Sequence, residues 1–225
     1  MRLAKRGHDT PAMQLFLNGE WLELSEKTEV LNPFDDSVID TVPSASPAEI
    51  TAAIDGLTKG AETMRNMPSH QRAEILRKTA GLMRERQEEL GRLISTEEGK
   101  VLAEGRIEAG RATETIDLCA DEARRLHGET VPLDSTPGGV GKLGFTLRVP
   151  CGIVAAITPF NFPLNLVAHK VGPAIAGGNA VLLKPASDTP LSSLKLVKLL
   201  LEACLLYTSD AADDTPCVDL GGRRI

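Results

Sequence analysis

Two short segments carry side chains that could bind a ligand. Thr158-Pro159-Phe160-Asn161-Phe162-Pro163 places an asparagine amide between two aromatic residues, and an amide nitrogen can donate two hydrogen bonds. Lys184-Pro185-Ala186-Ser187-Asp188 begins with a cation that could hydrogen-bond phosphate or the hydroxyls of a ribose. Asn161 and Lys184 are therefore the first candidates for a functional site.

The residues around these segments predict the strands and helices that would position them. Residues 151–157 are a continuous apolar run, which is typical of a strand buried on both faces, and residues 179–183 are a second such strand. Between them, residues 164–176 have helical spacing and end at Gly177-Gly178. A further helix is expected from Thr189-Pro190 to about Ala203.

This order of strand, helix, strand and helix predicts two parallel strands joined by a right-handed crossover. The loops that follow the two strands, residues 158–163 and 184–188, would then lie at the same carboxyl edge of the sheet. Open α/β sheets bind ligands at that edge, so both candidates fall where a ligand site is expected.

A second interpretation of the same residues needs no ligand. Pro159 and Pro163 would shape a tight turn, Asn161 would satisfy the turn backbone, and Lys184 would be a solvated lysine at the end of a strand. Geometry alone favours this interpretation for Lys184 and leaves the two balanced for Asn161. No Gly-x-Gly-x-x-Gly phosphate fingerprint follows either strand.

The N-terminal half predicts a hairpin followed by helices. Leu17-Asn18-Gly19-Glu20-Trp21 has a turn dipeptide between apolar residues. Ser46-Pro47-Ala48-Glu49 combines a capping serine, a proline at the first helical position and a glutamate three residues after the cap. From Arg72 to Gly99 the apolar residues keep a helical period, which predicts one long surface helix.

The next stretch gives weaker signals. A helix of about residues 103–126 is interrupted by Gly105 and Gly110, and Gly128 would supply its end. Residues 131–149 contain two prolines and a group of glycines, followed by alternating apolar residues. They predict a mobile loop followed by a strand.

Composition excludes several classes of partner. The 225 residues are 42% hydrophobic and 25% charged, which suits a globular chain with one sizeable core or two small ones. A formal net charge of −6, without a long Lys/Arg cluster, argues against a nucleic-acid partner. No apolar run approaches the ~18 residues that span a bilayer, and the basic start lacks the apolar core of a secretory signal. We therefore expect no membrane partner and a cytoplasmic location.

The four cysteines are far apart and form no Cys-x-x-Cys pair, so neither a disulfide framework nor a metal site is expected. Cys119 falls in a predicted helix and Cys151 opens a predicted buried strand, with no histidine or other base nearby in the sequence. Both are expected to be buried structural thiols.

Residues 157–163 and 178–187, together with their separation, closely resemble the aldehyde dehydrogenase superfamily. The hairpin segment, Asn32-Pro33 and Glu97-Glu98-Gly99-Lys100 resemble the opening of that family, so the resemblance covers about residues 14–203. It implies an α/β fold: an N-terminal helical region and part of a parallel, Rossmann-like cofactor-binding sheet, truncated. The variants of both motifs are similar to those of lactaldehyde, semialdehyde and non-phosphorylating glyceraldehyde-3-phosphate dehydrogenases.

The resemblance also implies a reaction: a cysteine thiolate attacks an aldehyde, hydride leaves for NAD(P)+, and a Glu-activated water hydrolyses the thioester. Asn161 matches the donor that stabilises the oxyanion. Lys184 matches the residue that holds the adenosine ribose of the cofactor. The segment Pro185-Ala186-Ser187 would belong to the same cofactor site. Thr158, Pro159 and Phe160 match the wall beside the cofactor.

Ser187 stands where NAD-preferring members usually carry a glutamate that accepts bonds from the ribose hydroxyls. A glutamate would repel a 2′-phosphate, whereas serine is small and neutral. NAD or NADP is therefore expected as cofactor. Ser187 could instead simply belong to the turn.

The family's general-base glutamate and nucleophilic cysteine would follow Ala203. Neither of these family motifs appears in residues 204–225. Asp219-Leu220-Gly221-Gly222 resembles the glutamate motif only superficially, because no strand precedes it. This tail lacks any period and is similar to translated sequencing adapter, although an acidic disordered tail is an alternative. The chain as given is expected to be an inactive fragment of its parent enzyme.

We therefore expect an upstream extension at residues 1–12, the N-terminal part of a cofactor-binding domain at 13–203, and a non-native tail at 204–225. Residues of about 129–149 match the family's arm for oligomer contacts, which implies a parent homodimer or homotetramer acting on a small-molecule aldehyde. The alternative function is a non-catalytic nucleotide-binding or interaction module.

Overall fold

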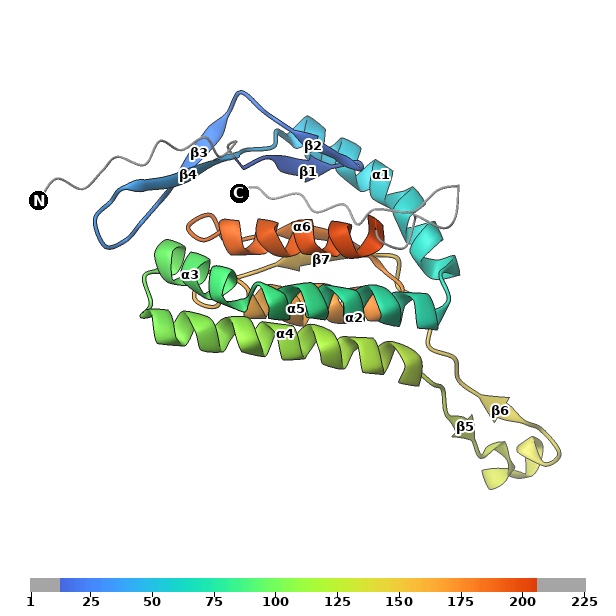
Figure 1. The fold of residues 1–225 in the computed structure, drawn as a ribbon. Helices are drawn as coiled ribbons and strands as arrows, with labels where there is room; N and C mark the ends of the chain where they lie inside the picture. Colours follow the sequence, from blue (N-terminus) through green and yellow to red (C-terminus); the bar gives the residue numbers. More distant parts are fainter. Residues whose placement is uncertain (1–12, 206–225) are drawn as a thin grey trace, which may run out of the picture.

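The computed structural model describes residues 13–205. Helices and a pair of parallel strands form its main body, and a narrow two-stranded arm extends away from it (Figure 1). The extension expected at residues 1–12 lies outside the described residues, as does the tail expected at 204–225 apart from its first two residues, which continue the last helix.

Two antiparallel hairpins begin the described chain. Strands β1 (Leu15–Leu17) and β2 (Glu20–Leu22) pair as predicted. Asn18 and Gly19 of their turn have φ of 50° and 84°, the left-handed backbone that makes a two-residue hairpin turn compatible with strand twist. The second hairpin, β3 (Lys27–Leu31) with β4 (Val38–Pro43), was not predicted.

Helix α1 (Pro47–Asn66) begins at the predicted capping box. The Ser46 hydroxyl accepts a hydrogen bond from the Glu49 backbone N–H at 3.3 Å, and the Glu49 carboxylate accepts one from the Ser46 N–H at 2.5 Å. Two N–H groups that a helix start leaves without partners are thereby satisfied.

The single long helix predicted for residues 72–99 is wrong. Two helices occupy this region, α2 (Ser69–Glu85) and α3 (Gln87–Glu98), and Arg86 between them has φ −108° and ψ 20°. The guanidinium of Arg86 donates to both carboxylate oxygens of Glu202, at 2.8 and 2.7 Å. Helical period persists across the break, because each helix keeps an apolar face, so the pattern alone does not reveal it.

Helix α4 (Leu102–Arg125) packs along α2 and α3. Gly105, which was expected to weaken it, lies where α4 packs closely against α3: an added Cβ would collide with the Gly91 carbonyl oxygen. Gly128 does not end the helix as predicted, since the last helical residue is Arg125. A side chain at Gly128 would instead collide with the Thr146 carbonyl. Glycine is therefore required here because the two backbone segments approach each other closely.

Gly105→Ala is expected to destabilise the chain by about 1–3 kcal/mol, because the clash with the Gly91 carbonyl outweighs the ~1 kcal/mol gain in helix propensity. Gly81→Ala in α2 is the matched control: no atom lies within 4 Å of its added Cβ, so it should stabilise by about 0.5–1 kcal/mol. Urea unfolding of both variants measures the difference, and effects of the same sign would contradict this account.

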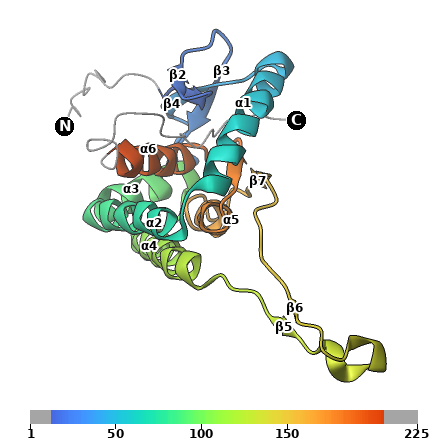
Figure 2. The same ribbon diagram turned by 90° about the vertical axis from the view of Figure 1, so that its right-hand side faces the viewer.

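Residues 130–145 form the projecting arm, which Figure 2 shows well away from the helices. Strands β5 (Thr130–Val131) and β6 (Gly144–Phe145) pair antiparallel, and two 3₁₀ turns, η1 (Leu133–Ser135) and η2 (Pro137–Gly139), lie between them. The predicted strand is therefore only two residues long. One further bond, from the Thr146 N–H to the Glu129 carbonyl at 2.8 Å, continues the pairing beyond these two residues.

Strands β7 (Ile153–Ile157) and β8 (Ala180–Lys184) are parallel, as predicted, with Ile153 opposite Ala180 and Ile157 opposite Lys184. They are connected by α5 (Asn165–Ala176), and α6 (Leu191–Leu205) follows β8.

Burial on both faces of β7 was predicted and is wrong. Val154 and Ala156 face the main core, together with Val181 and Leu183. The other side chains of the strand, at residues 153, 155 and 157, are exposed. In β8 the equivalent face is covered, since Leu182 packs against the small cluster of Leu15, Leu17, Ala45 and Ala53. An apolar run records what a strand can bury, not whether a covering layer is present.

Candidate functional site

The loops after β7 and β8 meet at one edge, as the parallel pairing requires. Thr158 N–H donates to the Lys184 carbonyl at 3.2 Å, which continues the ladder past the last strand residue. Further on, the Thr189 hydroxyl donates to the Phe160 carbonyl at 3.2 Å and the Ser193 hydroxyl donates to the Pro163 carbonyl at 3.1 Å. These bonds hold the two predicted segments against each other.

The predicted site residues differ in exposure at this edge. Asn161 and Pro159 are exposed and Phe160 is 55% exposed; Lys184, Ala186 and Ser187 are partly buried; Thr158 and Pro185 are buried. Within residues 13–205 neither the Asn161 amide, nor the Lys184 ammonium, nor the Ser187 hydroxyl makes a hydrogen bond or ion pair. The Asn161 side chain thus does not satisfy its own turn, contrary to the ligand-free interpretation.

Thr158 contributes a further polar atom. Its hydroxyl oxygen is buried at the end of β7 and lacks a hydrogen-bond partner among the described residues. A buried hydroxyl without a partner costs about 1–3 kcal/mol, so an additional polar group at this edge would be favoured.

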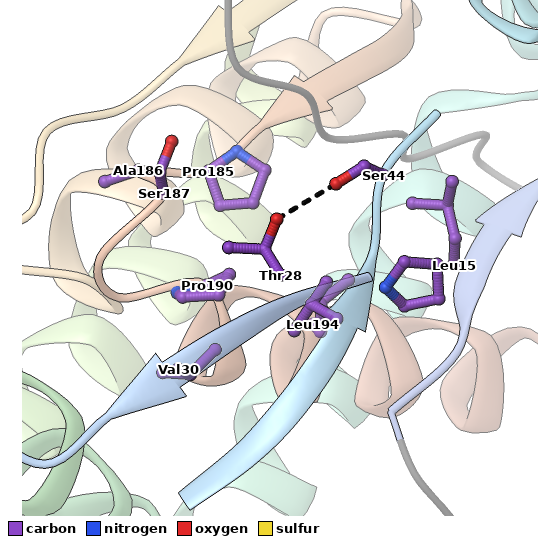
Figure 3. Close-up of a pocket in the computed structure, with 11 residues that line it drawn as sticks. Leu15, Thr28, Val30, Ser44, Pro185, Ala186, Ser187, Pro190 and Leu194 are labelled. Carbon is purple, nitrogen blue, oxygen red and sulfur yellow. Dashed lines mark hydrogen bonds between the residues drawn. The ribbon is translucent and has the colours of Figure 1, made fainter. Parts of the chain in front are cut away.

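A pocket lies between the β3–β4 hairpin and the loop after β8 (Figure 3). Pro185, Ala186 and Ser187 line one side, and Thr28 and Ser44, whose hydroxyl oxygens are 3.1 Å apart, line the other. The pocket volume is about 50 Å³, whereas small-molecule sites measure about 300–1,000 Å³. The pocket is therefore smaller than a typical small-molecule site, and it takes in just one of the two predicted segments.

Two buried glutamates hold the helices that start at this edge. The sequence analysis did not identify either of them as a functional position. Glu97 of α3 accepts the N–H groups of Leu191 and Ser192, both at 2.8 Å, at the start of α6. Glu108 of α4 accepts those of Leu164 and Asn165, at 3.0 and 3.1 Å, at the start of α5. Each carboxylate replaces a local cap and complements the helix dipole.

A signal for both glutamates exists in the sequence. Glu97 continues the buried stripe of Leu90 and Ile94, and Glu108 lies on the same stripe as Ala112. A charged residue on the apolar face of a helix is almost never fully buried without a partner, so it predicts a specific contact.

Burial raises the pKa of Glu97 from 4.5 to about 7, against the opposing effect of the hydrogen bonds from Ser192 and Leu191. The charged form is thus costly in the folded chain even though two N–H groups face it.

Comparison with known proteins shows the family. A profile of the Aldehyde dehydrogenase family matches residues 21–205. This chain belongs to the aldehyde dehydrogenase family. The 3-sulfolactaldehyde dehydrogenase of Priestia megaterium is 45% identical over 206 residues, which are 88% of this chain and 43% of that protein.

Solved structures agree with the fold predicted from the sequence. The NADP-dependent glyceraldehyde-3-phosphate dehydrogenase of Bacillus halodurans, complexed with NADP, has TM-score 0.85 and 33% identity, covering 95% of this chain and 43% of that one. The NAD-dependent benzaldehyde dehydrogenase of Corynebacterium glutamicum has TM-score 0.80 and 31% identity, with 96% and 45% covered. This aldehyde dehydrogenase chain therefore spans less than half the length of the relatives it matches.

The family resemblance implies a cysteine nucleophile, and neither of the two cysteines whose side chains are described, Cys119 and Cys151, suits that role at the loop edge. Cys119 is buried in α4, and burial raises its pKa to about 11, which disfavours the thiolate. Cys151 precedes β7 and so lies at the opposite end of the strand from Thr158. It was expected to be buried but is exposed, because that face of β7 is uncovered; its thiol donates to the Asn179 side-chain oxygen at 3.1 Å.

No helix within residues 13–205 is long and apolar enough to cross a membrane. The same residues hold no group of three or more histidine, cysteine or acidic side chains arranged to bind a metal ion.

Proposed function

We propose that this chain supplies the oxyanion donor and part of the NAD(P)+ site of an enzyme that oxidises an aldehyde to a carboxylic acid. The observation that supports it is that, within residues 13–205, the polar side-chain groups of Asn161, Lys184 and Ser187 at one sheet edge make no hydrogen bond or ion pair. Such groups are suited to meeting a ligand, and the carboxyl edge is the expected place.

Each residue has a distinct role in this proposal. The Asn161 amide donates to the oxygen of the aldehyde as negative charge develops on it, which occurs when a cysteine thiolate adds to the carbonyl carbon. Lys184 hydrogen-bonds ribose hydroxyls, and Thr158, Pro159 and Phe160 form the wall beside the cofactor. When bound, NAD(P)+ supplies the hydride acceptor.

The proposal is tested in a hybrid enzyme: residues 13–203 of this chain joined to the C-terminal remainder of the Priestia megaterium relative. We expect the hybrid to reduce NAD(P)+ when an aldehyde is added. Cofactor binding by the folded hybrid, with no turnover on any aldehyde, would favour the alternative of a non-catalytic nucleotide-binding module.

Ser187 is proposed to admit NADP+. Ser187→Glu in the hybrid should raise the KM for NADP+ at least about 10-fold more than that for NAD+, because a carboxylate repels the 2′-phosphate. Ser187→Gln is the matched control, with nearly the same size and no charge. Steady-state kinetics with both cofactors measure the ratio; equal changes in the two KM values would contradict the role of Ser187.

The arm is proposed to contact a second subunit in a homodimer or homotetramer of the whole enzyme. Three of its apolar side chains, those of Val140, Leu143 and Phe145, are more than half exposed, as are those of Leu147 and Val149, which follow the arm. Exposed apolar groups concentrated on a projecting element favour association.

A further inference from the structure

Lys100 places its ammonium next to the segment that carries Asn161. Its side chain is 9% exposed, and the nitrogen donates to Glu108 at 2.7 Å and to the backbone carbonyl of Asn161 at 3.0 Å. The same nitrogen lies 4.4 Å from the centre of the Phe162 ring. A lysine from the end of one helix thus contacts both residues of the Asn161–Phe162 peptide.

The backbone of Lys100 is itself fixed. Gly99 ends α3 with φ 86°, and a side chain there would approach Pro33 at 2.7 Å, so the chain can turn at this point only with glycine. The Lys100 carbonyl accepts a bond from Ser95 Oγ at 2.7 Å, and its N–H donates to Glu98 at 3.0 Å. The ammonium therefore reaches the loop from a rigid base.

We propose that Lys100 is a positioning residue, which holds the Asn161–Phe162 peptide and so sets the direction in which the Asn161 amide is presented. The proposal rests on the function proposed above for Asn161. The Asn161 side chain makes no hydrogen bond within residues 13–205, so its direction depends on the backbone that carries it. A donor misplaced by about 1 Å can lose much of its effect on a rate.

Charge compensation is the competing explanation, because a buried glutamate needs a partner and Glu108 has a side-chain exposure of 1%. The two explanations differ at the Asn161 carbonyl. Balancing Glu108 requires only the ammonium–carboxylate contact, whereas positioning requires the bond to the carbonyl as well.

The experiment is ¹⁵N relaxation NMR on the full 225-residue chain, without cofactor or aldehyde. The variants are Lys100→Met, the double variant Lys100→Met/Glu108→Gln, and Lys170→Met as a control on the exposed surface of α5. The double variant removes the ammonium together with the carboxylate 2.7 Å from it, and leaves Glu98, whose carboxylate lies 3.7 Å from the ammonium and is 15% exposed. The readouts are the order parameter of the Phe162 amide, which shares its peptide with the Asn161 carbonyl, and those of Leu164 and Asn165, which report the Glu108 cap.

In the double variant we expect the Phe162 order parameter to fall from about 0.85 to below about 0.6, while the Leu164 and Asn165 values stay high. A Phe162 value equal to that of the unmodified chain in the double variant would overturn the proposal and leave charge compensation as the role of Lys100. Unfolding of the single variant does not affect this test, because the double variant removes both charges. A separate measurement tests the proposed function itself. If Asn161→Ala leaves the rate of the hybrid enzyme unchanged, the function proposed for Asn161 is wrong.

Discussion

Asn161→Ala is expected to lower kcat of the hybrid enzyme about 100- to 1,000-fold, the usual cost of losing one oxyanion donor. The Asn161 amide is exposed and without a partner within residues 13–205, so its removal disturbs no protein contact. Its hydrogen bond would form as charge develops on the aldehyde oxygen. The KM for the aldehyde should therefore change little, since a bond made only in the transition state affects kcat.

Asn165→Ala is the matched control for this prediction. Asn165 lies on the same segment but at the start of α5, where its side-chain oxygen accepts a bond from Thr115 at 3.3 Å. Its replacement should leave kcat unchanged. Steady-state kinetics over a range of aldehyde concentrations separate the two parameters, and a rise in KM at constant kcat for Asn161→Ala would show that the residue binds substrate instead.

Glu97 is expected to make the chain less stable as the pH rises from 5 to 8. Its pKa is raised from 4.5 to about 7 by burial, so between these values the folded chain binds more protons than the unfolded chain. Protonation of Glu97 therefore contributes stability that is fully present below pH 4.5 and is lost as the pH rises through 7. The full contribution is about 3 kcal/mol.

Urea unfolding of the chain and of Glu97→Gln at pH 5, 6, 7 and 8 measures this contribution as a difference in pH dependence, which cancels the other titrating groups. Glu104→Gln, on the exposed surface of α4, is the control and should follow the unmodified chain. Parallel curves for the unmodified chain and Glu97→Gln would disprove the assignment to Glu97.

Local signals in the sequence were sufficient for much of the fold. The Asn18-Gly19 turn, the capping box at Ser46 and Glu49, and the parallel pairing of β7 with β8 are all found as predicted. Each depends on residues close together in the chain or on a periodicity that a single element must satisfy. For the same reason the loops carrying Asn161 and Lys184 could be placed at one edge, because parallel strands end on the same side.

Contacts between distant segments were decided only by the tertiary structure. The helix break at Arg86 occurs where its side chain bonds to Glu202. Gly105 is needed because the Gly91 carbonyl leaves no room for a side chain. One face of β7 is exposed because no layer packs against it among the described residues. The apolar pattern of each element is compatible with either outcome, since it records a preference for burial without naming the partner.

The same limit applies to the site. Types and spacing made Asn161 and Lys184 candidates, because a loop after a strand is a local feature, and the family resemblance added Ser187. Glu97 of α3 and Glu108 of α4 hold the starts of α6 and α5, and Lys100, between α3 and α4, contacts the loop. Only the packing of α3 and α4 against the starts of α5 and α6 brings these charges to the site. A buried charge is tolerated only where partners surround it, and those partners are fixed by the fold as a whole.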